Sequence, residues 1–156
     1  MKIILASKSG VRKQILDRYK IDNEVMASHV DEDEVKKSLL TEGANPLVIS
    51  KNLAELKSIK ISRKYPDRLV LGADSVISFN EELINKPKTR DEAFSILKKL
   101  NNSIHYLISS VCISKNGSMI WNYTDSSELK MKNLTDALLL KYLEKIKTET
   151  LLAYGV

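Results

Sequence analysis

The sequence predicts an α/β protein in which a mixed, twisted β-sheet is flanked by helices. Two observations favour this fold class. Short β-rich apolar segments alternate along the chain with segments whose apolar residues recur at helical spacing, and Asn116-Gly117 separates two β-rich segments as a hairpin turn does. The 156 residues contain no internal repeat and no Pro/Gly/Ser-rich linker, so we expect a single domain over residues 1–156. The expected order of elements is β-α-β-α-β-α-β-β-α.

The N-terminal segment is typical of a strand, a turn and a helix. Residues 2–6 form a short apolar run that predicts a buried strand, and residues 7–10 (Ser-Lys-Ser-Gly) predict a polar turn. The helix that follows has apolar residues at helical spacing: Val11, Ile15, Leu16 and Tyr19. Residues 23–28 predict a second strand, which leads into an acidic loop at residues 31–34.

The middle of the chain predicts a long helix and a long strand. Asn45-Pro46 indicates the helix start, because Asn caps free N–H groups and Pro is tolerated at the first helical position. The helix has an apolar stripe that consists of Ile49, Leu53, Leu56 and Ile59. This stripe ends before Tyr65-Pro66. Residues 68–79 carry the strongest strand signal of the sequence.

The remaining elements are predicted by their turns and caps. Residues 89–92 (Thr-Arg-Asp-Glu) match a capping box, so a helix is expected from there to Leu100. Asn116 and Gly117 both accept the positive φ of a type I′ turn, which predicts a hairpin between residues 103–115 and 118–131. A last helix is expected from about Thr135 to Ile146.

The composition excludes several classes of protein. A hydrophobic fraction of 43% and a net charge of only +5 lie far from the disordered class. A single cysteine, Cys112, and two histidines, His29 and His105, leave too few ligands for a disulfide framework or a structural zinc site. The short apolar run at the start is unlike a signal peptide, and no stretch has the length of a membrane span, so we expect a soluble cytoplasmic protein.

The charges are unevenly distributed. Residues 2–20 contain six Lys or Arg and one Asp, whereas residues 22–34 contain six Asp or Glu and no Lys or Arg. A basic segment followed by an acidic one is suited to bind a polyanion together with its metal counter-ion. Two solvated faces of opposite charge are the alternative, and they are the commoner reason for such runs.

The turn at residues 7–13 is a candidate phosphate site. Backbone N–H groups at a helix N-terminus, the hydroxyls of Ser7 and Ser9 and the flanking cations favour an anion. Arg12 can hold a phosphate with two hydrogen bonds, and Lys13 supplies a movable charge. An ordinary helix cap is the alternative interpretation.

Two carboxylates are candidates for catalysis. Asp74 interrupts an apolar strand, where a bare carboxylate is costly to bury, so it is paired, bound to metal or placed at the strand end. Glu32, in the acidic segment, could join Asp74 as a ligand of Mg²⁺, which prefers carboxylates together with water and phosphate oxygens. The alternatives are a structural ion pair for Asp74 and a solvated charge for Glu32. Walker, GxGxxG, HExxH and GxSxG motifs are absent.

Several short motifs together resemble the Maf family of nucleoside triphosphate pyrophosphatases. Residues 5–13 (LASKSGVRK) resemble the LASxSPxRR opening of that family, residues 30–32 its VDE, and residues 72–76 (GADSV) its GADTV. Four further matches, in the same order, are LAELK at 53–57, KP at 86–87, the segment from Leu100 through His105 to Val111, and AYG at 153–155. The resemblance spans the whole chain and implies the Maf/inosine triphosphatase-like fold.

The resemblance also implies a reaction and its residues. The family cuts the α–β phosphoanhydride of a noncanonical or modified nucleoside triphosphate, which gives a monophosphate and pyrophosphate with the help of Mg²⁺ or Mn²⁺. Asp74 would be the general base, and Glu32 would hold the metal together with Asp74. The residues that would bind the substrate are Ser7, Ser9, Arg12, Lys13, Lys57 and Lys86. A homodimer is allowed by the resemblance, whereas a nucleic-acid complex and membrane attachment are not expected.

Some positions depart from the family pattern. Gly10 replaces a Pro of the family pattern, and Lys13 replaces an Arg. The resemblance implies that Val11 and Ser75 are specificity positions. At the position of Val11, the dTTP/UTP-preferring branch of the family has Arg. Family members continue past the AYG motif, so a C-terminally shortened domain is expected. Two other functions are alternatives: a weakly active Maf-like protein that binds nucleotides or a partner in cell-division control, and a small nucleic-acid-binding domain suggested by the basic balance.

Overall fold

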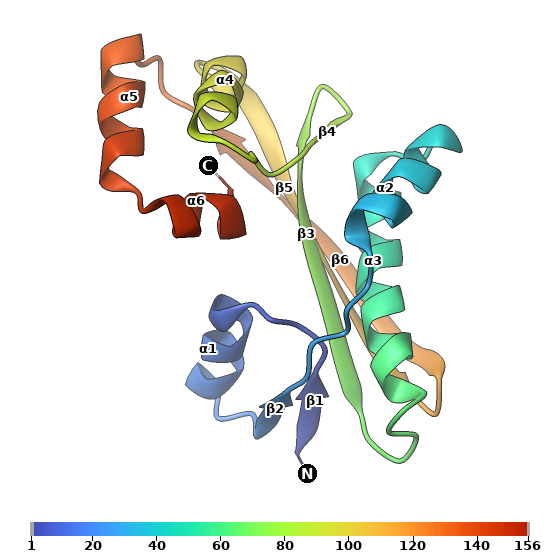
Figure 1. Cartoon of the computed structure of the whole chain (residues 1–156). Helices are drawn as coiled ribbons and strands as arrows, with labels where there is room; N and C mark the ends of the chain where they lie inside the picture. The colour runs from blue at the N-terminus through green and yellow to red at the C-terminus, as the bar shows by residue number, and fades with distance from the viewer. Residues whose placement is uncertain (1, 156) are drawn as a thin grey trace. The chain divides into compact units, whose positions relative to one another are not determined.

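The structure, a computed structural model, describes residues 2–155, with the backbone alone at Tyr154. Its sheet has six strands in the order β2-β1-β3-β5-β6, with β4 paired to β3 (Figure 1). The strands are β1 (Ile3–Leu5), β2 (Asn23–Val25), β3 (Val70–Phe79), β4 (Glu82–Ile84), β5 (Ile104–Lys115) and β6 (Ser118–Lys130). Strand β1 is parallel to both β2 and β3, whereas β4 is antiparallel to β3, so the predicted mixed sheet is confirmed.

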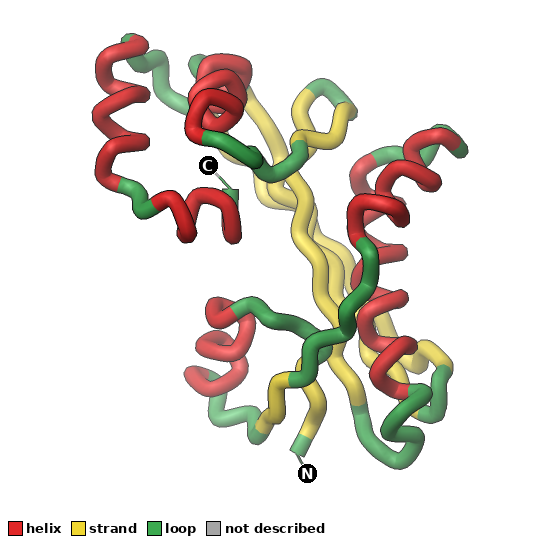
Figure 2. Tube along the Cα trace, viewed as in Figure 1, coloured by secondary structure: helices red, strands yellow, loops and turns green. Residues whose placement is uncertain are grey.

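Contacts divide the chain into two compact units. The first comprises residues 1–75 and 108–125, and the second comprises residues 76–107 and 126–156. The helices of the first unit are α1 (Gly10–Arg18), α2 (Glu32–Thr41) and α3 (Pro46–Ser62). Those of the second are α4 (Arg90–Leu100), α5 (Asp136–Lys145) and α6 (Thr148–Tyr154) (Figure 2).

The core of the first unit lies between β1, β3 and α3. Ile4 and Val70, from the paired strands β1 and β3, pack with Ile61 of α3. The buried face of α3 differs from the predicted stripe, because Leu56 is exposed and Lys57 is buried instead. On this face the small residues Ala54 and Ser58 lie against β3 at Gly72, so the helix and the strand approach each other closely there.

The second unit has its own core. Ala93 and Leu97 of α4 pack against Leu139 and Leu143 of α5 and against Leu151 of α6. The guanidinium of Arg90 donates hydrogen bonds to the Leu143 and Ile146 carbonyl oxygens and to Thr148 Oγ1, and so ties α4 to the connection between α5 and α6. Helix α6 was not predicted from the sequence.

Most predicted helix starts are confirmed by their caps. The side chains of Ser9, Asn45 and Thr135 each accept a hydrogen bond from a first-turn N–H group of their helix. The capping box at Thr89 is confirmed in one half only: Thr89 Oγ1 accepts from the Glu92 N–H, but the Glu92 carboxylate accepts from the N–H of Lys88 rather than of Thr89.

Two other sequence predictions have a clear outcome. The hairpin is confirmed, since Asn116 and Gly117 have φ values of 54° and 74° between β5 and β6. The prediction of an acidic loop at residues 31–34 was wrong. Residues 32–34 are the first turn of α2, and the Asp31 side chain caps this helix by accepting a hydrogen bond from the Glu34 N–H at 3.0 Å. Acidic side chains suit that position, because they interact with the positive end of the helix dipole. No helix in the described part of the chain is long and apolar enough to cross a membrane.

Candidate functional site

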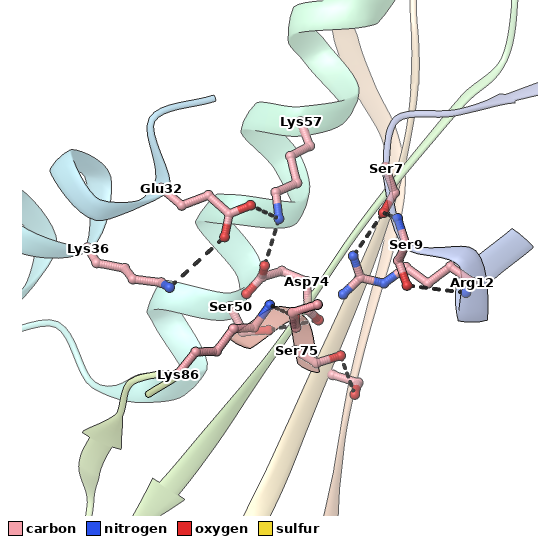
Figure 3. Close-up of polar contacts among 12 residues, drawn as sticks. Ser7, Ser9, Arg12, Glu32, Lys36, Ser50, Lys57, Asp74, Ser75 and Lys86 are labelled. Atoms are coloured by element: carbon pink, nitrogen blue, oxygen red, sulfur yellow. Dashed lines mark hydrogen bonds and ion pairs between the residues drawn. The ribbon is translucent and has the colours of Figure 1, made fainter. Parts of the chain in front are cut away.

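A cluster of charged and hydroxyl side chains lies beside β1 and β3 in the first unit (Figure 3). Leu5 and Leu71 are register partners in parallel strands, so the residues that follow them run in the same direction. Ser7 comes just after β1, and Asp74 lies further along β3. In α/β proteins, the carboxyl ends of parallel strands are where ligands bind.

The turn after β1 is organised by Ser7. Ser7 is only 6% exposed, and its Oγ accepts hydrogen bonds from the Ser9 N–H and from Arg12 Nη1, both at 3.1 Å. Ser9 is the N-cap of α1, where its Oγ accepts from the Arg12 N–H at 3.4 Å. These contacts fold the guanidinium of Arg12 back over the start of its own helix.

Arg12 lies within the electrostatic field of two carboxylates. Burial lowers the pKa of Arg12, and the negative charges of Asp74 and Glu32 oppose this by raising it. Three elements, α1, α2 and β3, therefore bring opposite charges to one place. Arg12 carries guanidinium donors there that match the oxygens of a phosphate group.

Lys57 of α3 links the two carboxylates. Its Nζ lies 2.8 Å from Asp74 Oδ1 and 2.8 Å from Glu32 Oε1. Lys57 and Asp74 are each 5% exposed, whereas Glu32 is more accessible. Lys36, one turn after Glu32 on α2, places its Nζ 4.0 Å from Glu32 Oε2.

One oxygen of Asp74 has no hydrogen-bond partner among the described residues. Oδ1 accepts from Lys57, but Oδ2 is buried and unpaired within the described part of the chain. Burial raises the pKa of Asp74. The positive charges of Lys57 and Arg12 oppose this shift, whereas the negative charge of Glu32 adds to it. An unpaired buried oxygen is costly, and such atoms are found where a ligand, water or ion completes the site.

The structure brings together six of the residues singled out from the sequence: Ser7, Ser9, Arg12, Glu32, Lys57 and Asp74. Lys13 lies apart from them, because it is exposed and forms an ion pair with Asp17 on the outer face of α1. Lys86 belongs to the second unit, where its Nζ donates to the Ala153 carbonyl oxygen at 2.8 Å.

The two positions predicted to determine specificity lie outside the polar cluster. Val11 is 49% exposed on α1, and Ser75 is exposed on β3, where its Oγ lies 3.0 Å from Ser109 Oγ. Asp74 and Ser75 are consecutive in a strand, so their side chains point to opposite faces of the sheet. Ser75 therefore faces away from the side on which Asp74 meets Lys57.

Two further members of the cluster were not found from the sequence. Lys36 stands four residues after Glu32, which is a signal only once residues 32–41 are known to be helical. Ser50 lies two turns before Lys57 on α3, and its buried Oγ donates to the Asp74 carbonyl oxygen at 3.3 Å. Its spacing of seven residues from Lys57 indicated a shared helix face.

Glu32 and Asp74 are suited to hold a divalent cation. Among the described residues, no group of three or more His, Cys, Asp or Glu side chains is placed to hold a metal ion. Mg²⁺ is commonly bound by one or two carboxylates, with phosphate oxygens and water completing its coordination. The unpaired Oδ2 of Asp74 fits such a ligand.

Fold and site define an α/β protein with a cluster of charged and hydroxyl side chains beside parallel strands. A family model described as "Maf-like protein" matches residues 2–155. The chain belongs to the Maf family, which confirms the resemblance seen in its motifs.

Two curated relatives agree with this assignment. The nucleoside triphosphate pyrophosphatase of Pelagibacter ubique (strain HTCC1062) is 58% identical over 154 residues, which are 99% of this chain and 79% of that protein. That of Ruegeria sp. (strain TM1040) is 36% identical over 143 residues, which are 92% of this chain and 72% of that protein. Among solved structures, the Ham1 protein of Staphylococcus aureus gives a TM-score of 0.49 at 16% identity, over 83% of this chain and 71% of that one.

Proposed function

We propose that this chain hydrolyses the α–β phosphoanhydride of nucleoside triphosphates and releases a nucleoside monophosphate and pyrophosphate. The names of its relatives support the activity. The observation that carries the proposal is Asp74, a buried carboxylate with one oxygen held by Lys57 and the other unpaired. Such a group can accept a proton from an attacking water molecule.

In this proposal Asp74 acts as the general base. Water attacks the α-phosphorus, its proton passes to Asp74, the bond from the α-phosphorus to the bridging oxygen breaks, and pyrophosphate leaves. Burial raises the pKa of Asp74 above that of an ordinary aspartate, which makes it a stronger base. A Mg²⁺ or Mn²⁺ ion held by Glu32 and Asp74 would neutralise phosphate charge and acidify the water.

The cations and hydroxyls would bind the triphosphate. Phosphoryl transfer depends mainly on positioning and on neutralising charge, so side chains that do both suffice. We assign this role to Arg12 and Lys57, with Ser7 and Ser9 holding the turn in place. Lys13 and Lys86 complete the proposed set of substrate-binding residues, and their positive charges would attract the triphosphate.

The nucleobase specificity is proposed to depend on Val11 and Ser75. Val11 replaces the Arg of the dTTP/UTP-preferring branch, so a preference for other noncanonical or modified nucleotides is expected. A reducing cytoplasmic compartment is also proposed, because a single cysteine, Cys112, cannot form an intrachain disulfide. A homodimer also stays a prediction, which sedimentation analysis of the purified protein tests.

Product analysis in ¹⁸O-labelled water tests the proposed function. A panel of canonical and modified triphosphates is incubated with the protein and Mg²⁺ or Mn²⁺. Pyrophosphate must appear, and the label must enter the monophosphate, because the α-phosphorus is attacked. Label in the released pyrophosphate would instead place the attack at the β-phosphorus. No turnover by folded protein, with nucleotide still bound, would instead support the binding-only function in cell-division control.

A further inference from the structure

We propose that the Lys57 ammonium competes with the divalent metal ion for Asp74 and Glu32, so that the site accepts the metal together with the nucleotide and binds the free ion weakly. This inference rests on the proposed function and concerns the form in which the substrate enters. It follows from the contacts of one buried lysine.

The position of Lys57 is the first reason. Its Nζ lies 2.8 Å from one oxygen of each carboxylate, and its side chain is almost fully buried. Two carboxylates close together repel each other, and a cation between them offsets that repulsion. Lys57 thus already supplies the positive charge that a metal ion would supply to the same two groups.

The charge of the cluster is the second reason. Glu32 and Asp74 carry two negative charges, whereas Arg12, Lys36 and Lys57 carry three positive ones, which leaves a sum of +1. The positive charges beside the two carboxylates weaken the attraction of these carboxylates for a free divalent cation. A triphosphate brings several negative charges, and these reverse the balance.

The nucleotide also gives Lys57 a new partner. The ammonium sits at the end of a flexible four-carbon stem and has three donors, so it can exchange carboxylate oxygens for phosphate oxygens. That exchange frees the carboxylates for the metal at the moment when the phosphates arrive. The same residue then neutralises the carboxylates in the free protein and the phosphates in the complex.

Metal affinity without nucleotide tests the inference. Mn²⁺ binding is measured by electron paramagnetic resonance for the wild type, for Lys57→Met and for Lys51→Met, which removes an exposed lysine of the same helix. Loss of the competing charge should tighten Mn²⁺ binding about tenfold or more in Lys57→Met. The control should bind Mn²⁺ as the wild type does. Equal or weaker binding in folded Lys57→Met would overturn the inference.

A measurement on the wild type covers the case in which Lys57→Met fails to fold. The ¹⁵N resonance of the Lys57 ammonium is followed while Mg²⁺ is added with or without a nonhydrolysable triphosphate. We expect the resonance to shift with both ligands and to stay in place with Mg²⁺ alone at the same concentration. An equal shift with Mg²⁺ alone would contradict the competition.

These tests are independent of turnover. Pyrophosphate release by the wild type decides the proposed function by itself. Tighter Mn²⁺ binding in Lys57→Met, together with no pyrophosphate release by the wild type, would uphold the competition and refute the proposed hydrolase function. Pyrophosphate release by the wild type, together with unchanged Mn²⁺ affinity in Lys57→Met, would uphold the hydrolase function and refute the competition.

Discussion

Gly72 of β3 lies directly against the backbone of Ala54 in α3. A Cβ at Gly72 would come within 2.1 Å of the Ala54 carbonyl oxygen and 2.8 Å of the Ser58 backbone nitrogen. Lys57 stands between Ala54 and Ser58 on that turn of the helix, and Asp74 follows Gly72 by two residues on the same face of the strand. The missing side chain therefore lets the helix approach closely enough for Lys57 to reach Asp74.

Gly72→Ala should both destabilise the protein and impair the site. The new methyl group meets backbone atoms, which cannot rotate away, so α3 must shift from β3, at a cost of about 3 kcal/mol in the free energy of unfolding. Urea denaturation measures this cost. Gly43→Ala is the control: it has open space but a φ of +80°, and it should cost about 1 kcal/mol. Equal losses in the two variants would refute the close-packing explanation.

Arg12→Lys should weaken substrate binding although the charge is kept. Lysine cannot reproduce the planar guanidinium that reaches Ser7 and presents paired donors to phosphate. We expect kcat/KM to fall about tenfold, chiefly through KM. Arg18→Lys, in the last turn of the same helix, controls for the substitution itself. If Arg12→Lys matched Arg18→Lys in kcat/KM, Arg12 would have no place in the phosphate site.

Lys86→Ala tests whether the second unit contributes to substrate binding. The proposal assigns Lys86 to the triphosphate, so its loss should raise KM more than it lowers kcat. Lys88→Ala removes a neighbouring exposed lysine and serves as the control. Steady-state kinetics with the preferred nucleotide measure both. An unchanged kcat/KM in Lys86→Ala would remove this residue from the site.

The raised pKa of Asp74 predicts a pH-dependent stability. Because the folded pKa lies above the ordinary value of 3.8, the native state binds more protons than the unfolded state between the two values, and stability falls as pH rises through that window. Asp74→Asn cannot ionise. It should therefore gain stability relative to the wild type as pH rises, in denaturation experiments without metal. A variant that loses relative stability toward neutral pH would contradict the burial of this charge.

Local signals predicted most elements of the fold. Asn45-Pro46, Asn116-Gly117 and Thr135 act through contacts within a few residues, so their effect is visible in the sequence. Helix α2 was missed because its acidic first turn has the composition of a loop. Its N-terminus is stabilised by the Asp31 cap and the helix dipole, which composition does not reveal.

The cluster was only partly predictable. The sequence placed Asp74 and Glu32 together at a metal ion and assigned Lys57 to the substrate, but the contact of Lys57 with both carboxylates depends on how closely α3 approaches β3. The apolar stripe predicted for α3 placed Leu56 in the core, whereas the glycine in β3 selects the face with Lys57. Contacts between distant segments decided these points.

The most direct test of the account is single-turnover hydrolysis by Asp74→Asn, with nucleotide affinity measured in the same variant. If Asp74 accepts the proton of the attacking water, the rate should fall by about 10² to 10⁴ while the Kd of the nucleotide changes little. Asp67→Asn, an exposed aspartate just before β3, should keep the wild-type rate. Pyrophosphate release by folded Asp74→Asn at the wild-type rate would contradict the central claim.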